Sequence, residues 1–275
     1  MSTVTIIRPL LKIQNNLFTL EEKLPMTMQV AMVGSNGVVI AGDTRWTHFP
    51  ALRPNQLWAT GTYGTNSPKI TIDYERGIAV SAAREMETAM RLAQEIAAHL
   101  PVGQFENPVS WVEDAGSRVL NEVRSERNTP DEHIEAHCLI VVRRPVHRLF
   151  RFQFALVDGQ WGSFCQEMTR LAIAGDNVNG AIFWPEAYYN SYPYATRRIP
   201  VKNLIPLAAH TVVLAHRLNP VTISGLEVVF CDETGFHRLS KESKESLELT
   251  VSRWDQQFGD TILNYSQEFS FEPHP

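Results

Sequence analysis

The stretch that decides the fold is MTMQVAMVGSNGVVIAGDTR, residues 26–45. Its apolar residues predict two β-strands, at 28–33 and 38–43. The second strand is apolar on both faces, which indicates deep burial. The turn between them contains Asn36-Gly37, a pair that readily supplies the positive φ of a tight hairpin. We therefore expect an antiparallel hairpin with a buried second strand.

Beyond this hairpin, blocks of strands are separated by helices. Helical spacing of apolar residues predicts helices at 86–100, 108–127 and 203–218. Residues 47–67 are expected to be a long loop, and residues 184–200 an elaborated loop with room for a helical turn. Short apolar runs predict further strands at 69–73, 77–82, 137–143, 148–157, 171–174, 225–231 and 236–239. Two antiparallel sheets with helices on their outer faces satisfy this order, whereas a Rossmann or TIM arrangement needs alternating βαβ units.

The composition excludes several classes of protein. Charged residues make up 20% of the 275 residues and apolar residues 44%, as in an ordinary globular protein. The net charge is −5, without the basic excess expected of a nucleic-acid binder. Cys138, Cys165 and Cys231 lie too far apart for a disulfide scaffold. The longest apolar stretch, 204–215, is too short to span a membrane, and no secretory signal is evident, so we expect a cytoplasmic protein.

The spacing of polar residues in the opening segment carries a family resemblance. Thr27 and Asp43 are sixteen positions apart, and Arg45 follows. This pattern resembles the start of mature proteasome β-type subunits, in which a Thr opens the chain. The run VVIAGD, at 38–43, resembles the peptidase subunit of the bacterial two-component ATP-dependent protease. Residues 69–83 also match the strands that carry the catalytic Lys and precede the oxyanion hole in that family.

The resemblance implies a fold and a division of the chain. The fold would be α+β, a four-layer αββα sandwich of two antiparallel sheets, as in N-terminal-nucleophile hydrolases. Residues 27–240 would form this domain. Residues 1–26 would be a leader or propeptide, possibly absent from the mature chain, and residues 241–275 a polar, irregular tail with helical character near 247–258.

The same resemblance assigns catalytic roles to Thr27, Asp43, Lys69 and Ala83. A Thr hydroxyl is a poor nucleophile unless a base takes its proton, and the α-amine of an N-terminal Thr can be that base. A buried Lys69 would favour the alkoxide, and Asp43 would keep that Lys charged. The backbone N–H of Ala83 would face the tetrahedral oxyanion. Extra residues separate Asp43 from Lys69, so Lys69 is assigned by its strand context.

Three supporting residues follow from the resemblance, two of them with departures from the family pattern. Arg45 falls in register with the family's basic residue. The family's Gly-Ser-Gly turn becomes Gly-Asp-Asn at 175–177, which places Asp176 where a Ser would contact the amine. Ser224 matches the later Asp-x-x-Ser-Gly element, but the Asp of that element is missing.

A first specificity pocket is expected from Trp46, Ser81 and Glu85. Ser81 would form its base, Trp46 an apolar side and Glu85 a wall that favours a basic group, unless Arg45 neutralises it. The alternative is that Glu85 merely begins a helix, where a carboxylate interacts favourably with the dipole.

The resulting functional hypothesis is an N-terminal-threonine peptidase of the proteasome β type. It would act on peptide or protein substrates without a cofactor or metal, as part of a homo-oligomeric ring. No ATPase partner can be assigned from the sequence. Two alternatives remain: an amidohydrolase of the same fold that acts on a small amide, and a non-catalytic ring-forming subunit.

Two further groups of residues were considered as sites. His133 and His137 bracket Glu135, but the spacing is not H-E-x-x-H and no third ligand is apparent, so a zinc site is not favoured. A contact surface between subunits is the expected use of an aromatic cluster, namely Trp184, Tyr188, Tyr189, Tyr192 and Tyr194.

Overall fold

The computed structural model describes residues 27–48, 63–101, 108–126, 135–157, 160–175, 179–190 and 199–265. Its strands are β1 (Met28–Val33), β2 (Val38–Gly42), β3 (Arg45–His48), β4 (Tyr63–Asn66), β5 (Ile70–Asp73), β6 (Ile78–Arg84), β7 (Ala136–Val142), β8 (Arg148–Val157), β9 (Gln160–Met168), β10 (Leu171–Gly175), β11 (Glu227–Cys231) and β12 (Phe236–Arg238). Its helices are α2 (Met86–His99), α3 (Pro108–Glu126), α4 (Asn179–Trp184), the π-helix η2 (Pro185–Asn190), α5 (Val201–Leu218) and α6 (Lys241–Tyr265).

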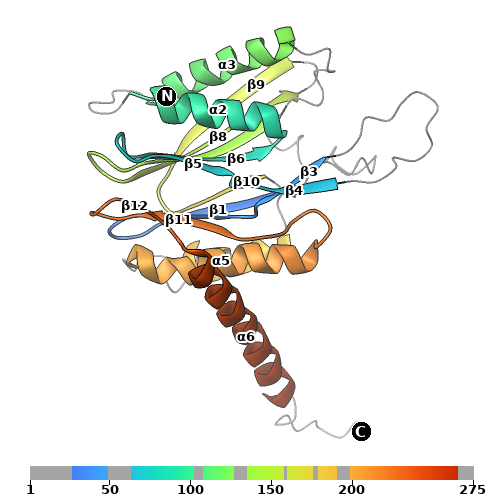
Figure 1. The fold of residues 1–275 in the computed structure, drawn as a ribbon. Helices are drawn as coiled ribbons and strands as arrows, with labels where there is room; N and C mark the ends of the chain where they lie inside the picture. The colour runs from blue at the N-terminus through green and yellow to red at the C-terminus, as the bar shows by residue number, and fades with distance from the viewer. Residues whose placement is uncertain are drawn as a thin grey trace, which may run out of the picture.

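The strands form two five-stranded antiparallel sheets and a separate two-stranded ribbon (Figure 1). The first sheet, here called the N-terminal sheet, has the order β10-β1-β2-β11-β12. The second, here called the central sheet, has the order β5-β6-β7-β8-β9. The ribbon pairs β3 with β4. The expected mixed α+β class with antiparallel sheets is therefore confirmed.

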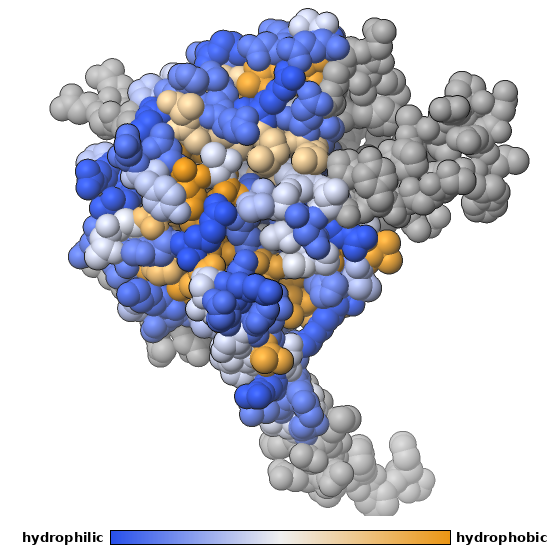
Figure 2. Space-filling view, viewed as in Figure 1, coloured by the Kyte–Doolittle hydropathy of each residue, from blue (hydrophilic) through white to orange (hydrophobic). Residues whose placement is uncertain are grey.

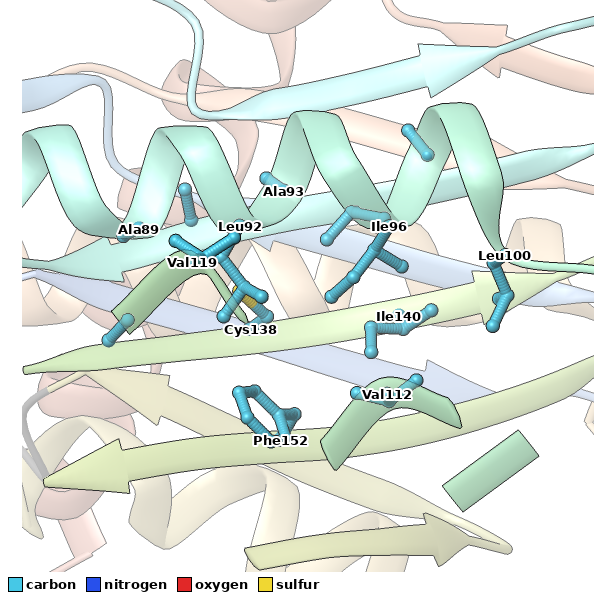
Figure 3. Packing of buried hydrophobic residues seen from close by; sticks show 14 of the residues in the cluster. Ala89, Leu92, Ala93, Ile96, Leu100, Val112, Val119, Cys138, Ile140 and Phe152 are labelled. Atoms are coloured by element: carbon cyan, nitrogen blue, oxygen red, sulfur yellow. The ribbon is translucent and has the colours of Figure 1, made fainter. Parts of the chain in front are cut away.

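Side chains of the central sheet divide between two apolar layers, as the period of a strand requires. On β6, Ile78 and Val80 pack toward α2 and α3, whereas Ala79 and Ala83 face the N-terminal sheet. Figure 3 shows the outer layer, where residues of α2 and α3 meet residues of β7 and β8. This packing fixes the central sheet between the helices and the other sheet.

The N-terminal sheet buries its outer face against α5. Val30 and Met32 of β1 share a cluster with Leu204, Ala208 and Val212 of that helix. On the molecular face drawn in Figure 2, hydrophilic residues predominate and apolar residues are scattered between them. Among the described helices, none is long and apolar enough to cross a membrane.

Several elements differ from the sequence-based expectations. The edge strand β9 was not predicted, because exposed polar side chains such as Gln166 and Glu167 dilute its apolar pattern. Part of the expected loop at 184–200 forms the end of α4 and η2. The ends of the loop expected at 47–67 form the ribbon of β3 and β4.

The tail contains the helix α6, which includes the expected helical stretch at 247–258 and extends beyond it in both directions. Asp255 on α6 lies 2.5 Å from the Nε2 of His210 on α5 and also pairs with Arg217. The rings of Phe258 and Trp184 meet edge to face at 5.1 Å between centroids. Beyond these contacts α6 runs away from the body of the molecule (Figure 1).

The turn between β1 and β2 has a different basis from the one expected. Neither Asn36 nor Gly37 adopts positive φ. A Cβ on Gly37 would instead lie 1.9 Å from the carbonyl oxygen of Cys231, so glycine is required by the close approach of β11. The Asn36 side chain accepts a hydrogen bond from the N–H of Val201, at the start of α5. The hairpin turn therefore fits against two other elements.

This contact predicts that Gly37→Ala destabilises the protein. The new methyl group would force β11 aside, at a cost of about 1–3 kcal/mol or more. Gly162→Ala is the matched control in a strand, because a Cβ there meets nothing within 4 Å. Urea unfolding should give a lower midpoint for Gly37→Ala only, and equal midpoints for both variants would contradict the packing.

Candidate active site

Thr27 lies at the start of β1, between the ends of β2 and β10. It is 2% exposed. Its neighbour Gly175 has φ +86°, and a Cβ on Gly175 would lie 2.1 Å from the carbonyl oxygen of Thr27. Only a residue without a side chain fits there, because both the backbone conformation and the space favour glycine.

Asp43, at the end of β2, is fully buried behind Thr27. Its carboxylate accepts hydrogen bonds from the N–H of Met28 at 3.0 Å and the N–H of Arg45 at 3.2 Å. Burial raises the pKa of Asp43 to about 6, although the adjacent Lys69 charge and these hydrogen bonds oppose the shift. The carboxylate is therefore largely ionised at neutral pH.

Lys69 reaches the same point from the central sheet, just before β5. Its Nζ donates to both oxygens of Asp43, at 2.9 and 3.1 Å, and to Oγ1 of Thr27 at 3.0 Å. The Trp46 ring covers the ammonium, with its centroid 4.6 Å from Nζ. Thr27, Asp43 and Lys69 thus converge, and the buried charge of Lys69 is paired and fully hydrogen-bonded.

This geometry limits what each group can do. A lysine ammonium has three donors and no acceptor, so Lys69 as placed donates to Thr27 Oγ1 and cannot take its proton. The positive charge stabilises negative charge that develops on that oxygen. A hydroxyl in this environment is prepared to become an alkoxide when another group removes its proton.

Glu227 on β11 also contacts Lys69, and sequence reasoning missed it. One oxygen of this buried carboxylate accepts from the N–H of Lys69 at 2.8 Å and of Ile70 at 3.2 Å. Its other oxygen pairs with Arg238 at 3.1 Å. Burial raises the pKa of Glu227, opposed by the Lys69 hydrogen bond and the Arg238 charge. Glu227 thereby fixes the backbone that carries the Lys69 ammonium.

Ala83 is buried near the end of β6, and its strand is tied to β1. The Gln29 side chain donates to the carbonyl oxygen of Ala82 at 2.6 Å. The next residue after Ala83, Arg84, has φ +82°, which is unusual for a residue with a side chain. A non-glycine residue keeps this conformation only where surrounding contacts hold it, so the end of β6 is fixed by its neighbours.

The supporting residues named from the sequence have different placements. Arg45 begins β3, and its N–H donates to Asp43. Ser224 acts through its backbone, since its carbonyl oxygen accepts from the N–H of Thr44 at 3.0 Å. Asp176 lies outside the described residues.

The residues expected to form a specificity pocket are engaged within the protein. Ser81 is fully buried, and its Oγ accepts from the N–H of Leu139 at 3.0 Å. Glu85 caps α2, accepting from the N–H groups of Glu87 and Thr88. Glu85 therefore takes the helix-start position that the sequence left open as its alternative. Trp46 is 2% exposed, belongs to the apolar cluster between the central sheet and the helices α2 and α3, and covers the Lys69 ammonium.

The remaining histidines and cysteines named from the sequence have other surroundings. Within the described ranges, no group of three His, Cys, Asp or Glu residues could hold a metal ion. His133 lies outside these ranges, whereas His137 contacts Glu135. Burial raises the pKa of the buried thiols of Cys138, Cys165 and Cys231.

Comparisons with known proteins find a likeness in fold. No family model matches the chain, and no curated protein matches it. Among solved structures, Anbu from Hyphomicrobium sp. strain MC1 is 14% identical with a TM-score of 0.57. A mutant form of that protein and Anbu from Yersinia bercovieri, described as an ancestral β-subunit, are each 13% identical with TM-scores of 0.55. Each match covers 90% of this chain and 100% of the other.

These structures correct the resemblance drawn from the sequence. That resemblance assigned the chain to the proteasome β-type subunits, and most closely to the two-component protease, and this assignment was wrong. The matching structures are Anbu proteins. The physical reason is that residues 26–45 determine a hairpin and the positions of Thr27, Asp43 and Arg45, and features this local do not identify a family.

The Glu227 contacts predict a specific loss of stability. Glu227→Leu leaves the N–H groups of Lys69 and Ile70 without their acceptor, and each buried orphan costs about 1–3 kcal/mol. We expect the free energy of unfolding to fall by at least about 2 kcal/mol, and by less in Glu227→Gln, whose amide oxygen can still accept. Glu245→Leu, on the exposed face of α6, should change it by less than about 0.5 kcal/mol. Equal stability of Glu227→Leu and Glu245→Leu would contradict the proposed role of Glu227 in holding the backbone of Lys69 and Ile70.

Proposed function

We propose that the protein is a proteasome-like hydrolase that cleaves amide bonds with Thr27 as an N-terminal nucleophile. The observation that carries this proposal is the contact of the buried Lys69 ammonium with Thr27 Oγ1 at 3.0 Å, backed by the Asp43 carboxylate. The Anbu-like fold supports it. Peptides or proteins are the proposed substrates, and no cofactor is required.

The reaction would proceed through an acyl-enzyme. The α-amine of Thr27 takes the hydroxyl proton while Oγ1 attacks the amide carbonyl carbon. Lys69 stabilises the developing alkoxide, and the backbone N–H of Ala83 is the proposed oxyanion donor. The tetrahedral intermediate collapses, and the leaving amine takes the proton from the α-amine. Water then hydrolyses the ester and restores the Thr27 hydroxyl.

This chemistry requires Thr27 to be the first residue. We propose that residues 1–26 are a leader removed before Thr27, and that residues 27–240 form the four-layer αββα sandwich of N-terminal-nucleophile hydrolases, followed by a tail at 241–275. Asp176 and Ser224 remain proposed neighbours of the amine. Trp46, Ser81 and Glu85 remain proposed borders of the specificity pocket.

Peptide hydrolysis by the full chain, and by a form that starts at Met26, tests the proposal. Methionine removal from the second form would expose Thr27 directly. We expect cleavage of fluorogenic peptides that is lost in Thr27→Ala and partly kept in Thr27→Ser. Cleavage of small amides alone would favour the amidohydrolase alternative. No cleavage by oligomers of either form would favour a non-catalytic subunit.

The charge pair predicts a pH dependence with a defined sign. As the pH falls, the α-amine gains a proton first, because its pKa is ordinarily about 7.7–8.0. Asp43 gains one below about pH 6, and Lys69 then loses its counter-charge. The logarithm of kcat/KM should therefore fall with a limiting slope of about two in the parent and about one in Asp43→Asn. Equal slopes would contradict the role of Asp43.

Removal of the ammonium should have a larger effect than removal of any surface lysine. We expect Lys69→Ala to lower kcat/KM by at least about 100-fold, because the alkoxide loses its stabilising charge. Lys202→Ala is the control, since its side chain is 69% exposed and lies 3.9 Å from Asp232. Comparable activity of the two variants would remove Lys69 from the mechanism.

We also propose a homo-oligomer, based on exposed aromatic residues beside α6. Trp184 stacks on Tyr188 at 4.8 Å between centroids, and Tyr188, Trp254 and Phe258 are each more than 40% exposed. Tyr189 is instead a core residue, with its hydroxyl against the carbonyl oxygen of Arg170. Tyr192 and Tyr194 lie outside the described residues.

Light scattering at micromolar concentration tests this surface. The parent protein should have the mass of several subunits, and Trp254→Ser with Phe258→Ser should reduce it, because exposed aromatic side chains of this kind commonly anchor interfaces. Tyr74→Ser is the control, because Tyr74 is 62% exposed at the distant turn between β5 and β6. A monomeric parent would contradict the proposal.

A further inference from the structure

His137 on β7 forms hydrogen bonds with both of its ring nitrogens. Its Nδ1 accepts from the N–H of Gly175 at 3.2 Å. Its Nε2 lies 2.9 Å from a carboxylate oxygen of Glu135. Because Nδ1 accepts, the proton must be on Nε2, which donates to Glu135. The ring is 8% exposed and is thus held between two fixed partners.

The first of these partners is in contact with the proposed nucleophile. Gly175 ends β10, and the register pairs it with Met28, the residue after Thr27. A Cβ on Gly175 would overlap the Thr27 carbonyl oxygen, so the two backbones touch. A shift of Gly175 would therefore displace Thr27.

The second partner holds the end of β6. The carboxylate of Glu135 lies 3.3 Å from Nε of Arg84, and its backbone carbonyl accepts from the N–H of Glu85 at 3.1 Å. Burial raises the pKa of Glu135, but the His137 hydrogen bond and the Arg84 charge outweigh it and lower the pKa overall. Glu135 is thus a stable anion beside Arg84, whose φ of +82° needs such support.

The ring of His137 lies on the face of the central sheet that carries Ala83. The register pairs Ala83 directly with His137, and paired residues share one face of a sheet. The His137 side chain therefore connects the backbone next to Thr27 with the end of β6 at Ala83 and Arg84. The charged pair of Lys69 and Asp43 does not make this connection.

We propose that His137 is a positioning residue for the reaction, which ties Gly175, beside Thr27, to Glu135 and Arg84, beside Ala83. These hydrogen bonds through His137 fix the distance between the attacking Oγ1 of Thr27 and the backbone N–H of Ala83. Misplacement of reacting groups by about 1 Å can cost about 100-fold in rate. The inference rests on the proposed function, because Thr27 and Ala83 have these roles only there.

Steady-state kinetics of peptide cleavage tests the inference. His137→Leu should lower kcat by about 10- to 100-fold and leave KM within about threefold, because the contacts with substrate are unchanged. His137→Asn should recover part of the loss, since its amide oxygen can accept from Gly175. Adding Glu135→Gln to His137→Leu should lower kcat little further, because both changes break one network. His99→Leu is the control, since His99 pairs with Glu95 on the exposed face of α2.

Hydrogen exchange of the Gly175 amide gives a readout that does not depend on activity. Exchange should be faster in His137→Leu than in the parent, and restored in His137→Asn. Unchanged kcat in a folded His137→Leu, or unchanged Gly175 exchange, would overturn the inference. If the parent is inactive but its Gly175 exchange still depends on His137, the hydrogen bond between His137 and Gly175 is supported. That result would overturn both the proposed function and the catalytic part of the inference. If His137→Leu fails to fold, His137→Phe, which keeps a planar ring but likewise has no acceptor for the Gly175 N–H, replaces it in the same comparisons.

Discussion

The buried ion pair of Lys69 and Asp43 is the constraint on which the rest of the structure depends. Neither side chain is exposed to water, and a buried ammonium is strongly unfavourable unless it is paired and hydrogen-bonded. Asp43 directly follows β2 of the N-terminal sheet, whereas Lys69 directly precedes β5 of the central sheet. The pair therefore forms only when the two sheets are correctly stacked on each other. The fold is needed to form the site, and the ion pair in turn stabilises that stacking.

Contacts around the ion pair of Lys69 and Asp43 fix the positions of the neighbouring backbone segments. Glu227 holds the backbone of Lys69 from β11, and Gly175 allows β10 to approach Thr27. Both elements belong to the N-terminal sheet, whereas Lys69, Ala83 and His137 come from the central sheet. The site is a junction between two rigid layers, which suits a reaction that depends on position and charge.

The sequence predicted those features that have a local signal. The hairpin at 28–43 and the main helices follow from periodicity, whereas the meeting of Asp43 and Lys69 at Thr27 was expected only from the family resemblance. The contacts of Glu227 with Lys69 and of His137 with Gly175 gave no such signal, because these partners lie 158 and 38 residues away along the chain. Two further errors, the missing β9 and the family assignment, arose because an edge strand has a weak apolar pattern and because one hairpin is too local to identify a family.

Covalent labelling tests the central claim most directly. The protein, with Thr27 as its first residue, would be incubated with a β-lactone inhibitor and digested, and the adduct would be located by mass spectrometry. The account predicts a single adduct on the Thr27 hydroxyl, absent from Lys69→Ala. An adduct on another residue, or labelling of Thr27 that persists at the parent rate without Lys69, would contradict it.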